Sequence, residues 1–385
     1  MRLLDFILAA VMASAPAAMA TKIAQPEPPA PVPAPQPVSQ IPKTPKVEVL
    51  FLLDTTGSMG GLIQGAKEKI WSIANEIAAG NPKPEIRMGL IAYRDRGDAY
   101  VTKVVDLNSD LDQVYEELLA LRAGGGGDGP EHVLKALADA SQKVSWDDDP
   151  SSFRVAYLVG DAPAHFDYGD TPALENLTQR LVAKGVILNT IQCGQDGSTT
   201  AQWRRIARLG DGSFLSIAQN GGTVSIATPF DEELSRLNGE LDSTMLIYGE
   251  RREEAREKKD RAARIAAAAP ASAAAERASF KAVRGFSAED DFVAALAEGG
   301  ADLNTADLKA LPQSLQTLTP AQRKAKVAEI QTQRKALREK IGELSRNRSA
   351  FIKKESAKTG SEEESFDAKL VDTLKRQAAK KGLRY

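Results

Sequence analysis

Apolar runs and amphipathic stretches alternate over the first 247 residues or so of the chain. Residues 47–53 are almost continuously apolar, which is typical of a strand buried on both faces of a sheet. Residues 62–79 then place apolar side chains at helical spacing. The same signals predict strands at 86–93, 100–107, 153–159, 186–191 and 213–217, and helices at 111–121, 132–144, 173–183, 201–209 and 229–246. This alternation predicts an α/β, doubly wound fold with a mostly parallel sheet, in which 100–107 is an edge strand and 229–246 is the closing helix.

The pattern changes after residue 248 into segments dominated by charge and alanine. Residues 251–264 are a dense run of mixed charge and 266–275 are rich in alanine, which suits a solvated helix or a linker. Apolar side chains then recur every seven residues at Ile330, Leu337, Leu344 and Phe351, with Val327 and Ile341 on the companion row. Arg334 and Arg348 interrupt that second row. The spacing predicts a long helix that forms either a weak coiled coil or a hairpin against an earlier helix.

These changes of pattern suggest how the chain is divided. We expect a doubly wound domain at 46–247, a charged and alanine-rich helical linker region at 248–320, and a helical, partly coiled-coil tail at 321–385. Because residues 356–385 are strongly charged, we expect them to be poorly ordered. Self-association through the C-terminal helix is compatible with the heptad spacing.

The first twenty residues have the layout of a secretory signal peptide. Arg2 supplies the positive start, 3–12 form a short apolar run, and Ala18-Met19-Ala20 forms a cleavage site. Residues 21–45 follow as a proline-rich linker, for which an extended and semi-rigid conformation is expected. The sequence therefore predicts a secreted protein, or a periplasmic one if the host is Gram-negative.

Composition and charge are those of a globular protein, with a net charge of −2 and 42% hydrophobic residues. The charge is uneven, since residues 248–385 carry about +8. An anionic surface would suit such a tail, but solvated helices are the favoured interpretation and no nucleic-acid partner is expected. The lone cysteine, Cys193, cannot form an internal disulfide and follows an apolar strand, so we expect a half-buried thiol.

Candidate chemistry begins where the first strand ends. The segment from Asp54 to Met59 reads D-T-T-G-S-M and offers one carboxylate and several hydroxyls in a tight turn before a helix. Oxygen ligands of this kind suit a hard cation such as Mg²⁺. Taken alone, the segment could equally be a polar strand-to-helix turn.

Two further segments favour a metal site. A glycine run at 124–127 is followed by Asp128, and glycine allows the backbone to approach an ion closely. Asp161 follows the strand at 153–159. Ligands of a doubly wound sheet bind beyond the carboxyl ends of its strands, where these loops are expected to converge. Asp95 and Asp98, in the turn after the second strand, could lie near the same face.

The ordered set of loops resembles the von Willebrand factor A family and its metal-ion-dependent adhesion site, over about residues 46–245. The family motif D-x-S/T-x-S corresponds to Asp54, Thr56 and Ser58, and its later aspartate corresponds to Asp161. Where the family usually has a threonine, this chain has Asp128. The resemblance implies a bound Mg²⁺, or Mn²⁺, with an open coordination position that a carboxylate of a partner can fill.

The predicted function is an exported, metal-dependent binding or adhesion module and not an enzyme. Its partner would be a protein that presents Asp or Glu, or an anionic polymer of the cell envelope. Two alternatives stay open: a structural envelope protein whose ion only stabilises the fold, and a Mg²⁺-dependent hydrolase. Against the hydrolase, the sequence has no phosphate-binding loop and no cofactor fingerprint, and its only histidines are His132 and His165.

Overall fold

The computed structural model describes residues 44–127, 129–219, 226–303, 305–359 and 366–385. The predicted signal peptide at 1–20, nearly all of the predicted linker at 21–45, and Asp128 therefore lie outside the described residues. No helix within the described ranges is long and apolar enough to cross a membrane.

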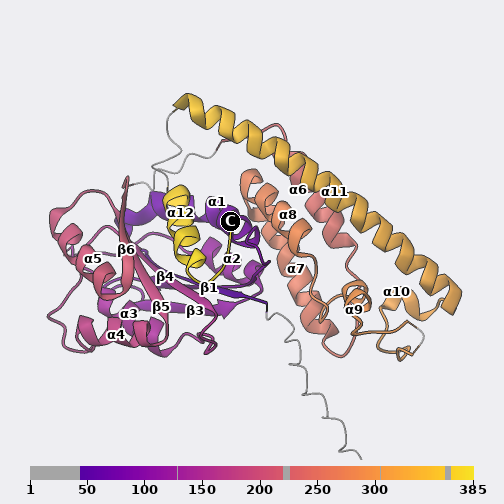
Figure 1. The fold of residues 1–385 in the computed structure, drawn as a ribbon, viewed down its shortest axis with the longest axis horizontal. Coiled ribbons are helices and arrows are strands. Elements are labelled where there is room, and N and C mark those ends of the chain that lie inside the picture. The colour runs from indigo at the N-terminus through magenta and orange to yellow at the C-terminus, as the bar shows by residue number, and fades with distance from the viewer. Residues whose placement is uncertain (1–43, 128, 220–225, 304, 360–365) are drawn as a thin grey trace, which may run out of the picture. The chain divides into compact units, whose positions relative to one another are not determined.

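A six-stranded sheet organises the first half of the described chain, in the order β3-β2-β1-β4-β5-β6 (Figure 1). The strands are β1 (Lys46–Asp54), β2 (Glu85–Tyr93), β3 (Thr102–Asn108), β4 (Phe153–Gly160), β5 (Val186–Cys193) and β6 (Asp211–Ile217). Only β3, at one edge, runs antiparallel to its neighbour, and the other pairs are parallel. The predicted doubly wound, mostly parallel α/β fold is confirmed.

Helices cover both faces of this sheet. The reason is seen in β1, whose successive side chains point alternately to the two faces and are apolar on both. Val49 and Phe51 point into one core and Leu50 and Leu52 into the other, so the central strand is apolar throughout. The helices that follow the strands are α1 (Gly60–Ala78), α2 (Leu111–Ala120), α3 (Val133–Gln142), α4 (Leu174–Ala183) and α5 (Gly197–Leu209). Every strand and helix predicted up to residue 217 forms, with ends shifted by a few residues. We call residues 44–217 the sheet domain.

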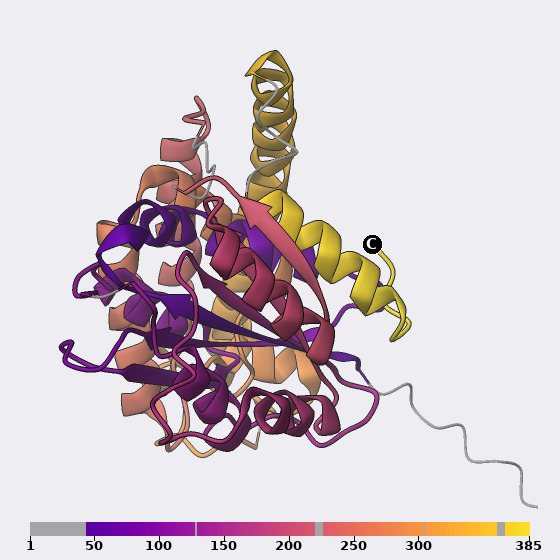
Figure 2. The same cartoon turned by 90° about the vertical axis from the view of Figure 1, so that its left-hand side faces the viewer.

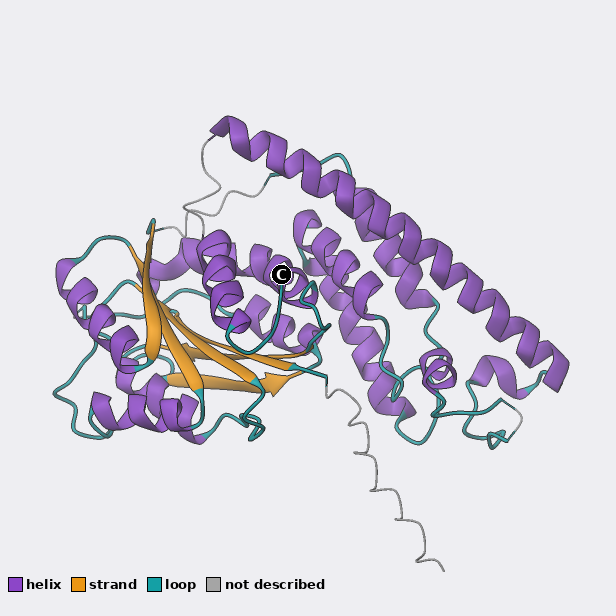
Figure 3. Cartoon of the chain, viewed as in Figure 1, coloured by secondary structure: helices purple, strands orange, loops and turns teal. Residues whose placement is uncertain are grey.

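A helical region follows, built from α6 (Asp231–Ser243), α7 (Arg252–Ala268), α8 (Ala271–Arg284), α9 (Phe292–Glu298), α10 (Gln313–Gln316) and α11 (Pro320–Thr359) (Figure 3). Leucines of α6 pack with alanines of α8 and with Leu337 and Ile341 of α11 in a common core. Leu344 packs at the edge of that core, and the Phe351 ring lies edge-on to Phe230 at 6.4 Å. The seven-residue stripe thus faces other helices of the same chain, one of the two arrangements left open by the sequence.

The arginines that interrupt the heptad pattern are buried and paired. Arg334 donates to both oxygens of Asp291, at 2.6 and 2.7 Å. Arg348 donates from Nε to Asp231 at 2.7 Å and also pairs with Glu276. The long arginine side chains carry their charge to acids on neighbouring elements, so both positions still contribute to packing.

The end of the chain departs from the sequence prediction. Residues 356–385 were expected to be poorly ordered, yet α12 (Phe366–Ala379) lies against the sheet beside α1 and β6 (Figure 2). Its Leu370 and Leu374 are buried in the same core as Phe51 and Tyr157. The predicted closing helix forms as α6, but it packs on α8 and α11 instead of on the sheet. The last described helix of the chain therefore covers this face of the sheet.

Candidate metal centre

The turn after β1 holds a buried carboxylate in a fixed orientation. Asp54 is fully buried, and its Oδ1 accepts hydrogen bonds from the Thr56 backbone N–H at 2.8 Å and from the Thr56 hydroxyl at 2.7 Å. The hydroxyl proton of Thr56 is used in this hydrogen bond, so the lone pairs of its oxygen stay available to coordinate a cation. Ser58 lies four residues after Asp54, in a short 3₁₀ turn (Gly57–Met59), and its side chain is exposed.

The glycine run pairs with this turn through its backbone. Gly57 N–H donates to the Gly125 carbonyl at 3.2 Å, and Gly124 N–H donates to the Thr55 carbonyl at 3.1 Å. Gly125 has φ of +80°, and a Cβ there would lie 2.1 Å from an oxygen of Asp98. The Asp98 carboxylate in turn accepts from Gly126 N–H. Only glycine fits at position 125, and Asp98 holds the loop against the turn.

Asp161 reaches the same edge because β4 lies directly beside β1 in parallel register. A Cβ on Gly160 would lie 2.9 Å from the Cβ of Asp54, so the absence of a side chain lets the two loops approach. One oxygen of Asp161 accepts a hydrogen bond from Gln219. The other oxygen is buried and has no hydrogen-bond partner among the described residues.

Glu131 is a fourth acidic residue of this centre, and the sequence analysis did not single it out. Its backbone N–H donates to Pro163 at 2.8 Å, and its carbonyl accepts from His165 at 3.0 Å, so its loop is joined to the one after Asp161. An acid just before a helix is ordinarily read as a favourable helix start, which hid this residue. Burial, together with the charges of Asp54 and Asp95, raises the pKa of Glu131 to about 9.

The acidic groups are buried together with few compensating donors. Asp54, Asp95, Glu131 and Asp161 each have one buried carboxylate oxygen without a hydrogen-bond partner among the described residues. The pKa of Asp54 is raised to about 7, because burial and the nearby charge of Asp161 outweigh the Thr56 hydrogen bonds, which lower it. Burying several carboxylate oxygens without donors is unfavourable, and a bound cation would offset that cost.

The donor set fits a divalent cation that prefers oxygen. Carboxylates and hydroxyls are hard ligands, as Mg²⁺ and Mn²⁺ require. Within the described residues, no three histidine, cysteine, aspartate or glutamate side chains form a metal-binding group by themselves. Of the residues proposed from sequence, Asp54, Thr56 and Asp161 lie at this edge, Ser58 follows on the exposed turn, and Asp128 lies outside the described residues.

Fold and site together define an α/β domain with an oxygen-rich centre at the carboxyl edge of a doubly wound sheet. The family model for the von Willebrand factor A domain matches residues 48–228, and this part of the chain belongs to that family. Domains of this family generally mediate protein interaction and adhesion, and they commonly bind a divalent metal ion at this position.

Curated relatives match about a third of this chain or less. The "Alpha-protein kinase vwkA" of Dictyostelium discoideum is 31% identical over 120 residues, which is 31% of this chain and 19% of that protein. The human "von Willebrand factor A domain-containing protein 7" is 36% identical over 94 residues, covering 24% of this chain and 10% of that protein. The chain thus matches a fifth or less of the length of these relatives.

Solved structures are similar to this chain over slightly less than half of its length. Proximal thread matrix protein 1 from the mussel byssus, with a zinc-occupied adhesion site, has a TM-score of 0.37 and 16% identity over 46% of this chain and 43% of that one. The SpRpn10 VWA domain has a TM-score of 0.35 and 16% identity over 46% of this chain and 89% of that one.

Proposed function

We propose that the protein is an exported binding module that holds Mg²⁺ or Mn²⁺ at the edge of its sheet and captures a carboxylate-bearing partner there. The observation that carries this proposal is a group of buried carboxylate oxygens, on Asp54, Asp161 and Glu131, that have no hydrogen-bond partner among the described residues and lie beside the Thr56 hydroxyl. Thr56, Ser58, Asp54, Asp161 and Asp128 are the residues that would hold the ion. When bound, the ion would supply a hard Lewis acid with a position open to an Asp, a Glu or an anionic envelope polymer.

Binding is favoured over catalysis by the surroundings of the two histidines. The His165 ring stacks on Tyr168 at 4.1 Å, and the His132 ring meets the same tyrosine edge-on at 4.9 Å. Tyr168 in turn hydrogen-bonds to Asp95. These contacts fix the loops around the centre and give both rings a packing role. The Mg²⁺-dependent hydrolase is therefore the less supported alternative.

A pull-down from an envelope extract tests the proposal. Thr56→Ala combined with Ser58→Ala removes both hydroxyl ligands and leaves the carboxylates, so we expect the fold to remain and the Mg²⁺-dependent capture to disappear. The wild type with chelator should match the double variant with Mg²⁺, and far-UV circular dichroism should be unchanged.

A structural role for the ion predicts a different outcome. If the ion only stabilises the fold, the double variant should lose stability and no partner should depend on Mg²⁺. A folded double variant that still captures every Mg²⁺-dependent partner would overturn the adhesion-site proposal.

A further inference from the structure

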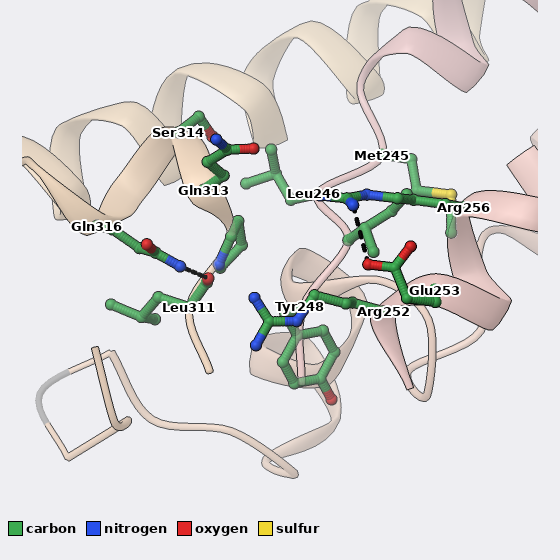
Figure 4. Close-up of a pocket in the computed structure, with 12 residues that line it drawn as sticks. Met245, Leu246, Tyr248, Arg252, Glu253, Arg256, Leu311, Gln313, Ser314 and Gln316 are labelled. Atoms are coloured by element: carbon green, nitrogen blue, oxygen red, sulfur yellow. Dashed lines mark hydrogen bonds and ion pairs between the residues drawn. The ribbon is translucent and has the colours of Figure 1, made fainter. Parts of the chain in front are cut away.

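A pocket of about 730 Å³ lies in the helical region, lined only by residues between 245 and 316 (Figure 4). Its walls are the extended segment 245–248 after α6, the first turns of α7, and the segment 311–316 that includes α10. None of its lining residues belongs to the metal centre. The volume falls in the range typical of sites for small ligands and short peptides.

Arg252 places a positive charge in this pocket without a counter-ion. Its Nη2 donates to the Lys309 carbonyl at 3.0 Å, and Arg252 makes no ion pair with any described residue. Its neighbours behave differently, since Arg251 pairs with Glu254 and Arg256 pairs with Glu253. Figure 4 shows the Arg252 guanidinium beside the Tyr248 ring, directed toward Leu311. An anionic group is the natural complement of this guanidinium.

The rest of the pocket combines apolar walls with hydrogen-bonding side chains. Leu246, half-buried, and Leu311, buried, belong to an apolar cluster of the helical region. Across the pocket, Gln313 and Ser314 are exposed, and their side chains make no hydrogen bond to a described residue. A peptide alternates polar amides with side chains, so it can contact both the apolar walls and the hydrogen-bonding groups. A purely apolar acid would leave the polar groups unused.

We propose that this pocket binds the C-terminal end of an extended peptide. The peptide carboxylate pairs with Arg252, its last apolar side chain packs on Leu246 and Leu311, and its amides bond to Gln313 and Ser314. This site is separate from the metal centre in residues and in chemistry. It gives the protein a second contact, for a peptide terminus, that requires no metal ion.

A library of acetylated tetrapeptides with free carboxyl ends, screened against the full chain, tests this site. The best binder is then made both as the free acid and as the C-terminal amide. We expect amidation and Arg252→Gln each to weaken its binding about tenfold or more, because each removes a charge-assisted hydrogen bond. Arg251→Gln, one residue earlier and outside the pocket, is the matched control and should bind normally.

Two further conditions separate this site from the metal centre. Binding should be the same with Mg²⁺ and with chelator, and Asp54→Ala should leave it unchanged. Thermal unfolding of Arg252→Gln checks the fold, since among the described residues that side chain makes a single hydrogen bond, to the Lys309 carbonyl. The proposal is wrong if no library member binds, or if the amide binds as well as the acid. It is also wrong if octanoate, a purely apolar acid, binds at Arg252 without displacing the peptide, because the peptide would then lie elsewhere.

Discussion

Arg277 of α8 donates two hydrogen bonds of 2.6 Å to Asp112 of α2, one to each carboxylate oxygen. The arginine is fully buried, and Asp242 of α6 lies 3.3 Å from its third nitrogen. Beside this pair, Asn75 of α1 donates to the carbonyl of Glu276, also on α8. The helical region is therefore joined to the sheet domain by buried polar contacts as well as by apolar packing.

Removing Arg277 should destabilise the whole protein. Arg277→Met removes the buried guanidinium and leaves Asp112 and Asp242 with Lys281 as their remaining cation among the described residues. Loss of one partner of a buried pair costs about 3–5 kcal/mol. Urea denaturation measures the free energy of unfolding. Arg251→Met, which removes an exposed ion pair with Glu254, should cost less than about 1 kcal/mol. Equal stability of the two variants would show that the buried pair does not hold the regions together.

The same pair predicts a loss of stability in acid. Burial alone would raise the pKa of Asp112, but Arg277 and Lys281 outweigh it and lower that pKa to about 2, below its ordinary value of 3.8. The ionised form is therefore favoured in the folded state, so this contribution is complete above about pH 4 and is lost as the pH falls toward 2. A shift of this size corresponds to roughly 2 kcal/mol. Unfolding free energies between pH 5 and 2 should fall more steeply in the wild type than in Asp112→Leu combined with Arg277→Met.

A divalent cation should raise the melting temperature. An ion that binds only the folded state stabilises it by about 2.7 kcal/mol when present at a hundred times its Kd. Calorimetry with Mg²⁺, Mn²⁺ and chelator measures the increment, and Asp54→Ala should abolish it. Asp167→Ala is the control, because this exposed acid follows Asp161 on the same loop and pairs with His165. Identical melting curves with Mg²⁺ and with chelator would rule out a metal site.

Local sequence patterns predicted the sheet and part of the metal centre. The rest of the centre depends on contacts between residues distant in sequence and could not be predicted from local patterns. The apolar runs report burial directly, and Asp54, Thr56 and Ser58 are read from a single turn. Glu131 was missed because its role depends on Pro163 and His165, which are distant in sequence but pair with its backbone.

The end of the chain was misjudged for the same kind of reason. The apolar residues of α12, among them Leu370 and Leu374, are separated by charges, and the surface that they cover belongs to strands far earlier in the chain. High local charge therefore suggested disorder where an amphipathic helix packs. Asn189 and Gln377, which exchange hydrogen bonds of 3.0 and 2.7 Å across this contact, carry no sequence signal of their pairing.

The apolar stripe of α11 should stabilise the chain from within. Leu337→Lys combined with Leu344→Lys places two charges against α6 and α8, and burying unpaired charge is strongly unfavourable. We expect reduced helicity and a loss of several kcal/mol in unfolding free energy. Lys substituted at Thr332, which is exposed on the same helix, should have little effect. Dissociation of an oligomer by the double variant, with the fold intact, would instead favour an intermolecular coiled coil.

α12 should unfold together with the sheet. Leu374 is 1% exposed, and Leu374→Asp would bury a charge between α12 and the core beneath it. The three tryptophans, Trp71, Trp146 and Trp203, are all buried in the sheet domain, so their fluorescence reports the unfolding of that domain.

We therefore expect the tryptophan transition of Leu374→Asp to move to lower denaturant, by an amount equivalent to several kcal/mol. Arg376→Ala, two residues later and exposed in a pair with Asp372, should leave the transition within about 0.5 kcal/mol of the wild type. If the far-UV signal of Leu374→Asp falls while the tryptophan transition stays in place, α12 frays without the sheet. The final helix would then be a peripheral addition to the von Willebrand factor A domain and not the cover of its core.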